Sequence, residues 1–388
     1  MSAPARVVIS GAGPAGLTLA LLLARAGVPV TVLGAEPPAE TAAPDLRAYS
    51  LNRASERLLT EAGTWPLLPR ALCQPMRRIV VWDACSSGRF ELEAAALGAP
   101  HLAHIVPHPV LLAALWQAAL AAPHLELLPA RLHDWREQAA GLELLLSDGR
   151  TRHAALLAAA DGAASWVRER LRVPSLSWEY GHTAVTGVVH CEWPHDATGW
   201  QRFLPEGPVA LLPLADGQCS CIWSTAPAQA EGLAAMDAAA FGAALTVATE
   251  GALGAIRTAG PRQRFTLRAA LIRDYSAGRC VFLGDAAHRI HPLAGQGLNQ
   301  GLKDVADLCQ VVLAAAAKGH DLGGARVCRA YGRARLADNA LMLAGMEGLK
   351  RLFATRVPVL RALRGFGLTQ VNRSEVFKAM IAAVAGSA

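Results

Sequence analysis

The feature that most constrains the fold is a glycine-rich loop between two apolar segments near the N-terminus. Arg6–Ser10 (RVVIS) has the pattern of a buried strand, Leu17–Arg25 (LTLALLLAR) that of a buried helix, and Val28–Leu33 that of a second strand. The loop reads GAGPAG over residues 11–16. In a βαβ unit the first glycine permits the turn, the second lets a pyrophosphate approach, and the third lets helix and strand pack closely. The sequence therefore predicts a dinucleotide-binding domain.

In such units an acidic residue usually binds the adenosine ribose at the end of the second strand. Glu36 lies twenty residues after Gly16, but the end of the second strand is Gly34. Two interpretations remain open. Either the strand end bulges and Glu36 makes the ribose contact, or the contact is missing.

A second constraint is the stretch 279–299, which reads RCVFLGDAAHRIHPLAGQGLN. Cys280–Leu283 predicts a buried strand that ends in Gly284-Asp285, and a helical pattern begins at Leu298. Free N–H groups at a helix start favour an anion, and a nearby aspartate can accept hydrogen bonds from a sugar hydroxyl. This stretch suits a ligand that carries phosphate and an electron-rich ring. The alternative is a tight strand-to-helix turn with a capping aspartate.

A third strand-to-helix turn, or corner, with an acidic residue beside a glycine lies in the middle of the chain. Leu142–Leu146 and Ala154–Ala160 are predicted to pair as a hairpin around Ser147–Arg150. The second strand then ends in Asp161-Gly162, and Ser165 and Arg168 follow on a new helix. The alternative here is a simple capping turn.

Two basic residues are candidates for cofactor contacts. Arg47 is a lone base in the segment DLRAYSLN, where a phosphate contact and an ordinary surface arginine are equally consistent with the spacing. His108 stands at the start of a helix predicted over Pro107–Ala121. It either contacts the cofactor or caps the helix.

The region 175–223 differs from the rest because it is rich in strand-forming residues and tryptophan. Val209–Leu214 and Cys219–Trp223 flank a turn, which predicts an antiparallel sheet in a second domain. A helix is predicted over Ala234–Glu250 and a strand near Arg264–Leu267. Long helices are predicted over 298–317 and 325–350.

The composition describes an ordered globular protein, since 53% of the 388 residues are hydrophobic and 18% are charged. The eight cysteines show no CxxC spacing, which indicates free thiols in a reducing compartment and no metal site. The uncharged segment Val7–Ala24 is interrupted by glycines, so we interpret it as a strand, turn and helix and not as a membrane or signal segment.

The net charge is +6, and the segment Glu347–Lys378 holds seven lysines and arginines against two acids. Such a basic stretch fits a membrane-surface or partner-docking face, or a solvated basic helix. We expect no nucleic-acid partner.

Together, the three motifs resemble those of the flavoprotein aromatic hydroxylases, the p-hydroxybenzoate hydroxylase-like group of FAD-dependent monooxygenases. They stand in the order Gly11-x-Gly13-x-x-Gly16, Asp161-Gly162 with Ser165 and Arg168, and Gly284-Asp285 with His288, Pro292 and Gly295-Gln296-Gly297. The likeness covers nearly the whole chain. Arg202–Leu214, Gln218–Trp223 and Leu336–Gly348 are similar in particular to the ubiquinone-biosynthesis hydroxylases.

The resemblance implies an α/β fold with a Rossmann-like FAD-binding domain of the p-hydroxybenzoate hydroxylase (GR2) type. Residues 1–72, 98–174 and 269–330 would form that domain, 73–97 and 175–268 an inserted antiparallel substrate domain, and 331–388 a C-terminal helical region. The expected FAD-binding residues are Gly11, Gly13, Pro14, Ala15, Gly16, Glu36, Arg47, His108, Asp161, Gly162, Gly284, Asp285, Pro292, Gly295, Gln296, Gly297, Leu298 and Asn299.

The implied reaction is hydroxylation of a prenylated phenol or quinol ring through a flavin C4a-hydroperoxide, with O₂ as co-substrate. A second GxGxxG is absent from the sequence, so NAD(P)H would bind transiently or another protein would deliver electrons. No catalytic base is identified, although His291 and Pro292 would lie near the isoalloxazine ring. We expect a cytoplasmic protein, either free or peripheral to the inner membrane, and leave its self-association open.

Two alternatives carry weight. One is an FAD reductase or another aromatic hydroxylase of the same fold. The other is a non-catalytic scaffold subunit of a quinone-biosynthesis complex, suggested by Gly34 and the basic C-terminal segment.

Overall fold

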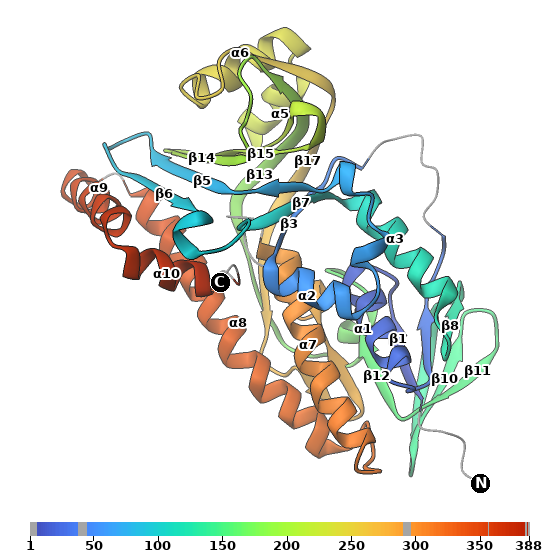
Figure 1. Ribbon diagram of the computed structural model, residues 1–388. Coiled ribbons are helices and arrows are strands. Elements are labelled where there is room, and N and C mark those ends of the chain that lie inside the picture. Colours follow the sequence, from blue (N-terminus) through green and yellow to red (C-terminus); the bar gives the residue numbers. More distant parts are fainter. Residues whose placement is uncertain (1–5, 38–44, 290–295, 356, 385, 387–388) are drawn as a thin grey trace.

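A six-stranded sheet forms the base of the molecule (Figure 1). The computed structural model describes residues 6–37, 45–289, 296–355, 357–384 and 386. The strand order is β18-β19-β12-β1-β2-β8. The strands are β1 (Val7–Ser10), β2 (Val30–Leu33), β8 (Leu125–Leu128), β12 (Leu156–Ala159), β18 (Ser276–Ala277) and β19 (Cys280–Phe282). All are parallel except the edge strand β18. Every residue of β1, β2 and β12 is buried, as expected for a sheet covered on both faces.

The main core lies on both sides of this sheet. Helix α1 (Pro14–Arg25) packs against both α3 (His108–Ala121) and α7 (Gln296–Ala316). A three-stranded antiparallel sheet adds Leu142, Leu144 and Leu146 to the same core. Its strands are β9 (Leu132–Gln138), β10 (Gly141–Leu146) and β11 (Thr151–Ala154).

An eight-stranded sheet forms the second layer of the fold, in the order β20-β17-β13-β16-β15-β14-β5-β6. The strands are β5 (Arg78–Asp83), β6 (Arg89–Glu93), β13 (Ser175–Cys191), β14 (Thr198–Leu204), β15 (Gly207–Pro213), β16 (Gln218–Thr225), β17 (Ile256–Ile272) and β20 (His288–Arg289). Helices α5 (Pro227–Ala235) and α6 (Ala238–Ala248) pack on this sheet and bury Leu233, Phe241 and Leu245 in a second hydrophobic core. Because β5 and β6 join strands from 175–272, we keep the discontinuous domain division as a proposal.

A small sheet connects the two layers, with the order β3-β7-β4. It contains β3 (Ala48–Asn52), β4 (Gln74–Met76) and β7 (Ala103–Pro107), and α2 (Arg53–Glu61) and the short η1 (Trp65–Leu67) follow β3. A short helix, α4 (Trp166–Arg170), follows β12.

The C-terminal helices are α8 (Ala325–Ala354), α9 (Pro358–Arg373) and α10 (Glu375–Val384). Helix α8 packs along α7, and α9 lies against β6 (Figure 1). Arg364 of α9 donates to the carboxylate of Asp83 at the end of β5, and both side chains are buried. Phe353 stacks on Phe203 of β14 at 3.7 Å between ring centroids. The C-terminal helices are therefore anchored to the antiparallel sheet.

Two predictions of local structure are wrong. The hairpin partner of β10 is Thr151–Ala154, whereas Leu156–Ala159 leaves the hairpin and lies beside β1 in the parallel sheet. The single helix predicted over Ala234–Glu250 is two helices, because Asp237 takes an extended conformation and caps α6 through the N–H of Ala240.

Candidate functional site

The three sequence motifs meet at one edge of the parallel sheet. In the register of the strands, Ser10 lies opposite Ala159, which in turn lies opposite Phe282. The ladder continues past the strand ends, since Ala160 N–H donates to Ser10 and Leu283 N–H donates to Ala159. The residues that follow, Gly11, Asp161 and Gly284, therefore leave the sheet side by side at its carboxyl edge. This edge is where open α/β sheets bind ligands.

The glycine loop is shaped by two contacts with its own backbone. Gly11 has φ +107°, and a Cβ there would lie 2.4 Å from the carbonyl oxygen of Ala160. A Cβ on Gly16 would lie 2.2 Å from the carbonyl oxygen of Gly11. A Cβ on Gly13 would meet no atom within 4 Å. Gly11 and Gly16 are thus required by packing, whereas Gly13 faces open space, as expected where a pyrophosphate approaches.

The start of α1 is left without a capping side chain. Gly13 is the N-cap, Pro14 follows it, and the first turn contains no acidic residue. The N–H groups at a helix start carry partial positive charge and point away from the helix. An anionic group above Gly13 would satisfy them, so this loop fits a phosphate.

Asp161 presents a buried oxygen to the same edge. Its Oδ2 accepts from Val167 N–H at 3.2 Å, which fixes the carboxylate. Its Oδ1 is buried and has no hydrogen-bond partner within the part of the chain that the structure describes. The neighbouring Gly162 has φ +82° and open space beside it. A buried acceptor beside open space can accept a hydrogen bond from a bound molecule.

Arg168 ties the second motif to the third. Its guanidinium donates to the carbonyl oxygen of Ala286 at 2.9 Å and to that of Ala163 at 2.7 Å. Its own backbone N–H is capped by Ser165. This arginine fixes the distance between the Asp161 and Gly284 corners.

The Gly284-Asp285 corner is held from below by a buried carboxylate. Gly284 has φ +59°, and its N–H donates to Asp304 Oδ2 at 2.8 Å. The same oxygen contacts His288 Nε2 at 2.6 Å, and Oδ1 accepts from Arg335 Nε at 2.7 Å. Asp285 itself points outward, with 59% of its side chain exposed. The buried Asp304 thus positions the backbone from which Asp285 projects.

Burial alone would raise the pKa of Asp304. The contacts with His288, Arg335 and the Gly284 N–H outweigh that effect and hold the pKa below its ordinary value of 3.8. Asp304 is therefore ionised at neutral pH. The pKa of Arg335 is raised by its partners Asp304, Asp338 and Asp307, although burial opposes this. Nothing in the sequence pattern distinguished these residues from ordinary helix surface charges.

Arg47 and His108 lie together with two residues that the sequence analysis did not identify, Asp45 and Tyr49. Arg47 forms a two-pronged ion pair with Asp45, and the His108 Nδ1 lies 2.9 Å from the Tyr49 hydroxyl. Burial lowers the pKa of His108, and the charge of Arg47 lowers it further. Burial raises the pKa of Tyr49 to about 12. The Asp45 contact raises the pKa of Arg47, and the charge of Asp285 adds to this.

Asn299 and its neighbours begin α7. The Asn299 side chain accepts from Asn52 N–H and Ser55 Oγ and donates to the Ser50 carbonyl. The Asn299 side chain therefore connects α7 to β3 and α2. Leu298 packs against the main core, and Gly297 has open space beside it. His291, Pro292 and Gly295 lie outside the described residues, as does the side chain of Gln296.

The end of β2 turns at Gly34, which has φ +68°. Ala35 is buried, and Glu36 is exposed just beyond it. The chain thus bends where the usual acidic residue would stand. Glu36 remains a prediction for the ribose contact.

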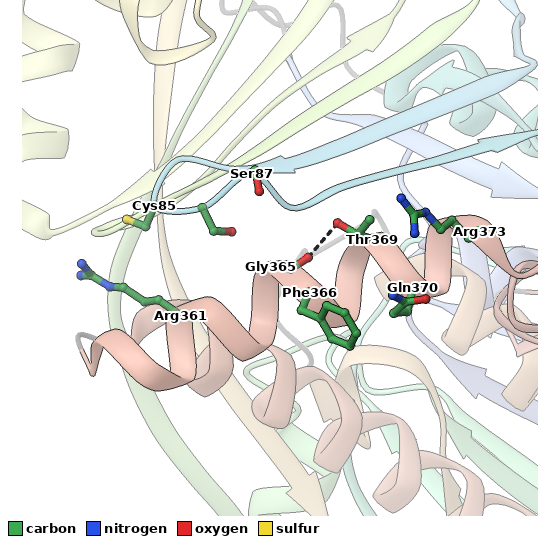
Figure 2. Close-up of a pocket in the computed structure, with 9 residues that line it drawn as sticks. Cys85, Ser87, Arg361, Gly365, Phe366, Thr369, Gln370 and Arg373 are labelled. Atoms are coloured by element: carbon green, nitrogen blue, oxygen red, sulfur yellow. Dashed lines mark hydrogen bonds between the residues drawn. The ribbon is translucent and has the colours of Figure 1, made fainter.

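A cavity of about 800 Å³ opens elsewhere, between the β5–β6 turn and α9 (Figure 2). Gly88 and Gly365 let the two elements approach, because a Cβ on Gly88 would lie 2.9 Å from the Gly365 Cα. The lining residues are Cys85, Ser86, Ser87, Arg361, Gly365, Phe366, Thr369, Gln370 and Arg373. None of them belongs to the three motifs, so this cavity is separate from the candidate site.

Comparison with known proteins places the chain in a family. Residues 4–343 match the FAD binding domain family. The chain is 36% identical over 381 residues to the 3-demethoxyubiquinol 3-hydroxylase of Escherichia coli K12, with 97% of this chain and 96% of that protein covered. It is 33% identical to the zebrafish (Danio rerio) ubiquinone biosynthesis monooxygenase COQ6, with 87% and 79% covered. The structure of Klebsiella pneumoniae HpxO, solved with FAD and uric acid, superposes with a TM-score of 0.74 at 18% identity, with 99% and 97% covered.

The family match and the relatives named as a hydroxylase and a monooxygenase show that the chain is an FAD-dependent monooxygenase. The chain belongs to the FAD binding domain family. The expected fold class, the FAD cofactor and the monooxygenase class are thereby confirmed.

Proposed function

We propose that this protein uses FAD, NAD(P)H and O₂ to hydroxylate the ring of a prenylated quinol precursor in ubiquinone biosynthesis. One observation carries the proposal: Gly11, Asp161 and Gly284 leave adjacent strands at one edge of the sheet. The relatives named as ubiquinone hydroxylases support the substrate class.

The residues present fit FAD. The bare start of α1 and the open face of Gly13 would hold the pyrophosphate. The unpartnered Asp161 Oδ1 would accept a hydrogen bond from the cofactor. Asp285 would bind the ribityl region, with Arg47 in reach of its charge. The start of α7 near Gly297 would stabilise negative charge on the reduced ring.

When bound, reduced FAD supplies the activation of O₂ for transfer to an electron-rich ring. The protein's part is to orient the ring, exclude water and balance charge. The antiparallel sheet packs Val185, Leu211 and Trp223 against α5 and α6, so its opposite face is the one that would shield the ring. His108, whose lowered pKa keeps it neutral at pH 7, adds no positive charge of its own beside Arg47.

The experiment is a flavin spectrum of the purified protein followed by NAD(P)H oxidation with a short-chain demethoxyubiquinol. We expect bound FAD, oxidation that the quinol stimulates, and a hydroxylated product. Bound FAD with oxidation but no hydroxylated product would favour the reductase alternative. Absence of any flavin affinity would favour the scaffold alternative.

The substrate is membrane-soluble, so the protein needs a route to the lipid surface. No helix among the described residues is long and apolar enough to cross a bilayer. Helices α9 and α10 leave large apolar side chains exposed, at Leu363, Phe366, Val376, Phe377 and Met380. We therefore place the membrane contact on this apolar surface, with Arg361 and Arg373 facing anionic headgroups.

The structure reduces the basic charge available there. Arg364 is buried against Asp83, and Lys350 lies over the ring of Tyr180 and donates to its carbonyl. Arg356 lies outside the described residues. The apolar side chains thus carry more of the proposed contact than the sequence charge count suggested.

Sedimentation with vesicles that contain anionic lipid tests this contact. Phe366→Ser with Phe377→Ser should reduce binding, while Val247→Ser on α6, an apolar position more exposed than either phenylalanine, should not. If the wild type, the double variant and Val247→Ser bound equally well, the C-terminal helices would not form the membrane contact.

A further inference from the structure

Three side chains with metal-binding atoms meet in a part of the molecule that the proposed flavin site does not use. Glu56 lies in the first turn of α2, His101 precedes β7, and His104 lies within β7. A Glu56 carboxylate oxygen is 2.9 Å from His101 Nε2, and the other is 2.7 Å from His104 Nδ1. The ligand atoms of the three residues all lie within 4.8 Å of one another. The side chains are only 13–17% exposed.

The three side chains are held by regular structure. His104 lies opposite Leu51 of β3 on one side and Pro75 of β4 on the other. The ring of Trp65 packs edge-on against His104, with centroids 5.3 Å apart, and the two histidine rings are 4.2 Å apart. The cluster is therefore built from a helix, a strand and an aromatic wall, and not from mobile surface side chains.

The donor set suits a transition-metal ion. Two imidazole nitrogens and one carboxylate oxygen are ligands that Zn²⁺ and its first-row neighbours accept. In the hydrogen-bonded arrangement each imidazole carries a proton on the nitrogen that faces Glu56. If that proton moves to the other ring nitrogen, the facing lone pair is free to bind an ion. Tetrahedral Zn²⁺ with ligand bonds of about 2.0–2.2 Å requires each imidazole nitrogen to move away from the Glu56 oxygen by roughly 0.4–0.9 Å.

We propose that Glu56, His101 and His104 form a binding site for one divalent first-row transition ion, with Zn²⁺ as the probe. The ion would join α2 to β7 and leave a further coordination position for water. Because Ser55, beside Glu56, donates to Asn299 at the start of α7, the ion would also support the wall of the flavin crevice. The cysteine spacing, on which the expectation of no metal was based, contains no information about this cluster.

The test uses the full-length, FAD-loaded protein after treatment with a chelator. Zn²⁺ is titrated by calorimetry, and bound metal is counted by mass spectrometry after desalting. The wild type should bind one ion per chain at this site. His101→Asn, His104→Asn and Glu56→Gln should each weaken that binding at least tenfold. The matched controls are Glu61→Gln, exposed at the other end of α2, and His133→Asn, an exposed histidine on β9, which should bind as the wild type does.

Two outcomes would overturn the proposal. One is a wild-type affinity no higher than that of the cluster variants. The other is Zn²⁺ binding that disappears when the free cysteines are blocked but persists in the cluster variants. Thermal melting distinguishes loss of metal binding from poor folding of a variant. Zn²⁺ should raise the Tm of the wild type and leave that of Glu56→Gln unchanged. Flavin content, measured in parallel, separates failure of this site from failure of the proposed function.

Discussion

Gly11 and Gly13 stand two residues apart in one loop, yet an added methyl group would meet different surroundings. At Gly11 it would overlap the Ala160 carbonyl in a left-handed backbone, and at Gly13 it would enter open space. We predict that Gly11→Ala lowers the free energy of unfolding by about 2–5 kcal/mol. Gly13→Ala should leave Tm of the flavin-free protein unchanged and weaken FAD binding by about tenfold or more, equal to about 1.4 kcal/mol.

Thermal unfolding of the flavin-free variants and fluorescence titration with FAD measure the two effects separately. If Gly13→Ala bound FAD as tightly as the wild type, the pyrophosphate would not lie above the start of α1. If both variants lost stability equally, the open space at Gly13 would have no functional meaning.

Asp304 accepts hydrogen bonds from Gly284, His288 and Arg335 in a fully buried position. Asp304→Asn would leave the buried Arg335 with only its partly exposed partners Asp307 and Asp338, which we expect to cost up to about 3–5 kcal/mol. Because the folded-state pKa of Asp304 lies below 3.8, its stabilisation is complete above that pH and is lost as the pH falls through the folded-state pKa.

Denaturant unfolding of both proteins from pH 7 down to pH 3 checks this prediction. The difference in unfolding free energy between wild type and Asp304→Asn should be largest at neutral pH and should decrease only in strong acid. A gap that is already absent at pH 7 would show that the Asp304 network does not hold the Gly284 corner.

At the level of residues, the sequence identified those that face a ligand better than those that hold them. Gly11 and Asp161 belong to local motifs whose spacing has a physical meaning. Asp304 lies on a helix twenty residues after Gly284, and Arg335 lies a further helix away. Their contact depends on how α7 and α8 pack, which no local pattern contains.

A buried ion pair joins α9 to the antiparallel sheet. Arg364 of α9 contacts Asp83 and the carbonyl oxygens of Leu352 and Phe353. Arg364→Leu would leave Asp83 buried without its partner, at a local cost of about 3–5 kcal/mol. We predict faster proteolysis of the segment 357–384 with unchanged flavin content. Arg351→Leu, at an arginine with 78% of its side chain exposed, is the matched control.

The rate and position of proteolytic cleavage in Arg364→Leu and Arg351→Leu are compared by mass spectrometry. Equal cleavage of both would mean that the apolar packing of α9, and not the ion pair, anchors the C-terminal helices. Loss of flavin in Arg364→Leu would show that the position of α9 also affects the FAD site.

Elements were predicted well where one periodicity dominated. The first βαβ unit and the hairpin of β15 and β16 follow from local pattern and turn residues. The assignment of Leu156–Ala159 to a hairpin was wrong because an apolar run fits either an antiparallel arm or a buried parallel strand. Only its position beside β1 distinguishes the two.

At the scale of the whole molecule, the proposed hydroxylation requires the antiparallel sheet to cover the flavin ring at the edge of the parallel sheet. Strand β20, which begins four residues after Gly284, pairs with β17 of the antiparallel sheet, and this supports the arrangement. Hydroxylation by a flavin-dependent monooxygenase takes the new oxygen atom of the product from O₂ and not from water.

The most direct measurement is mass spectrometry of the product formed from a short-chain demethoxyubiquinol, NAD(P)H and isotopically labelled O₂ by the FAD-loaded protein. We predict a hydroxylated ring that carries one labelled oxygen atom, and no product without the quinol, the reductant or FAD. A product whose oxygen comes from water, or NAD(P)H oxidation with no ring hydroxylation at all, would contradict the account.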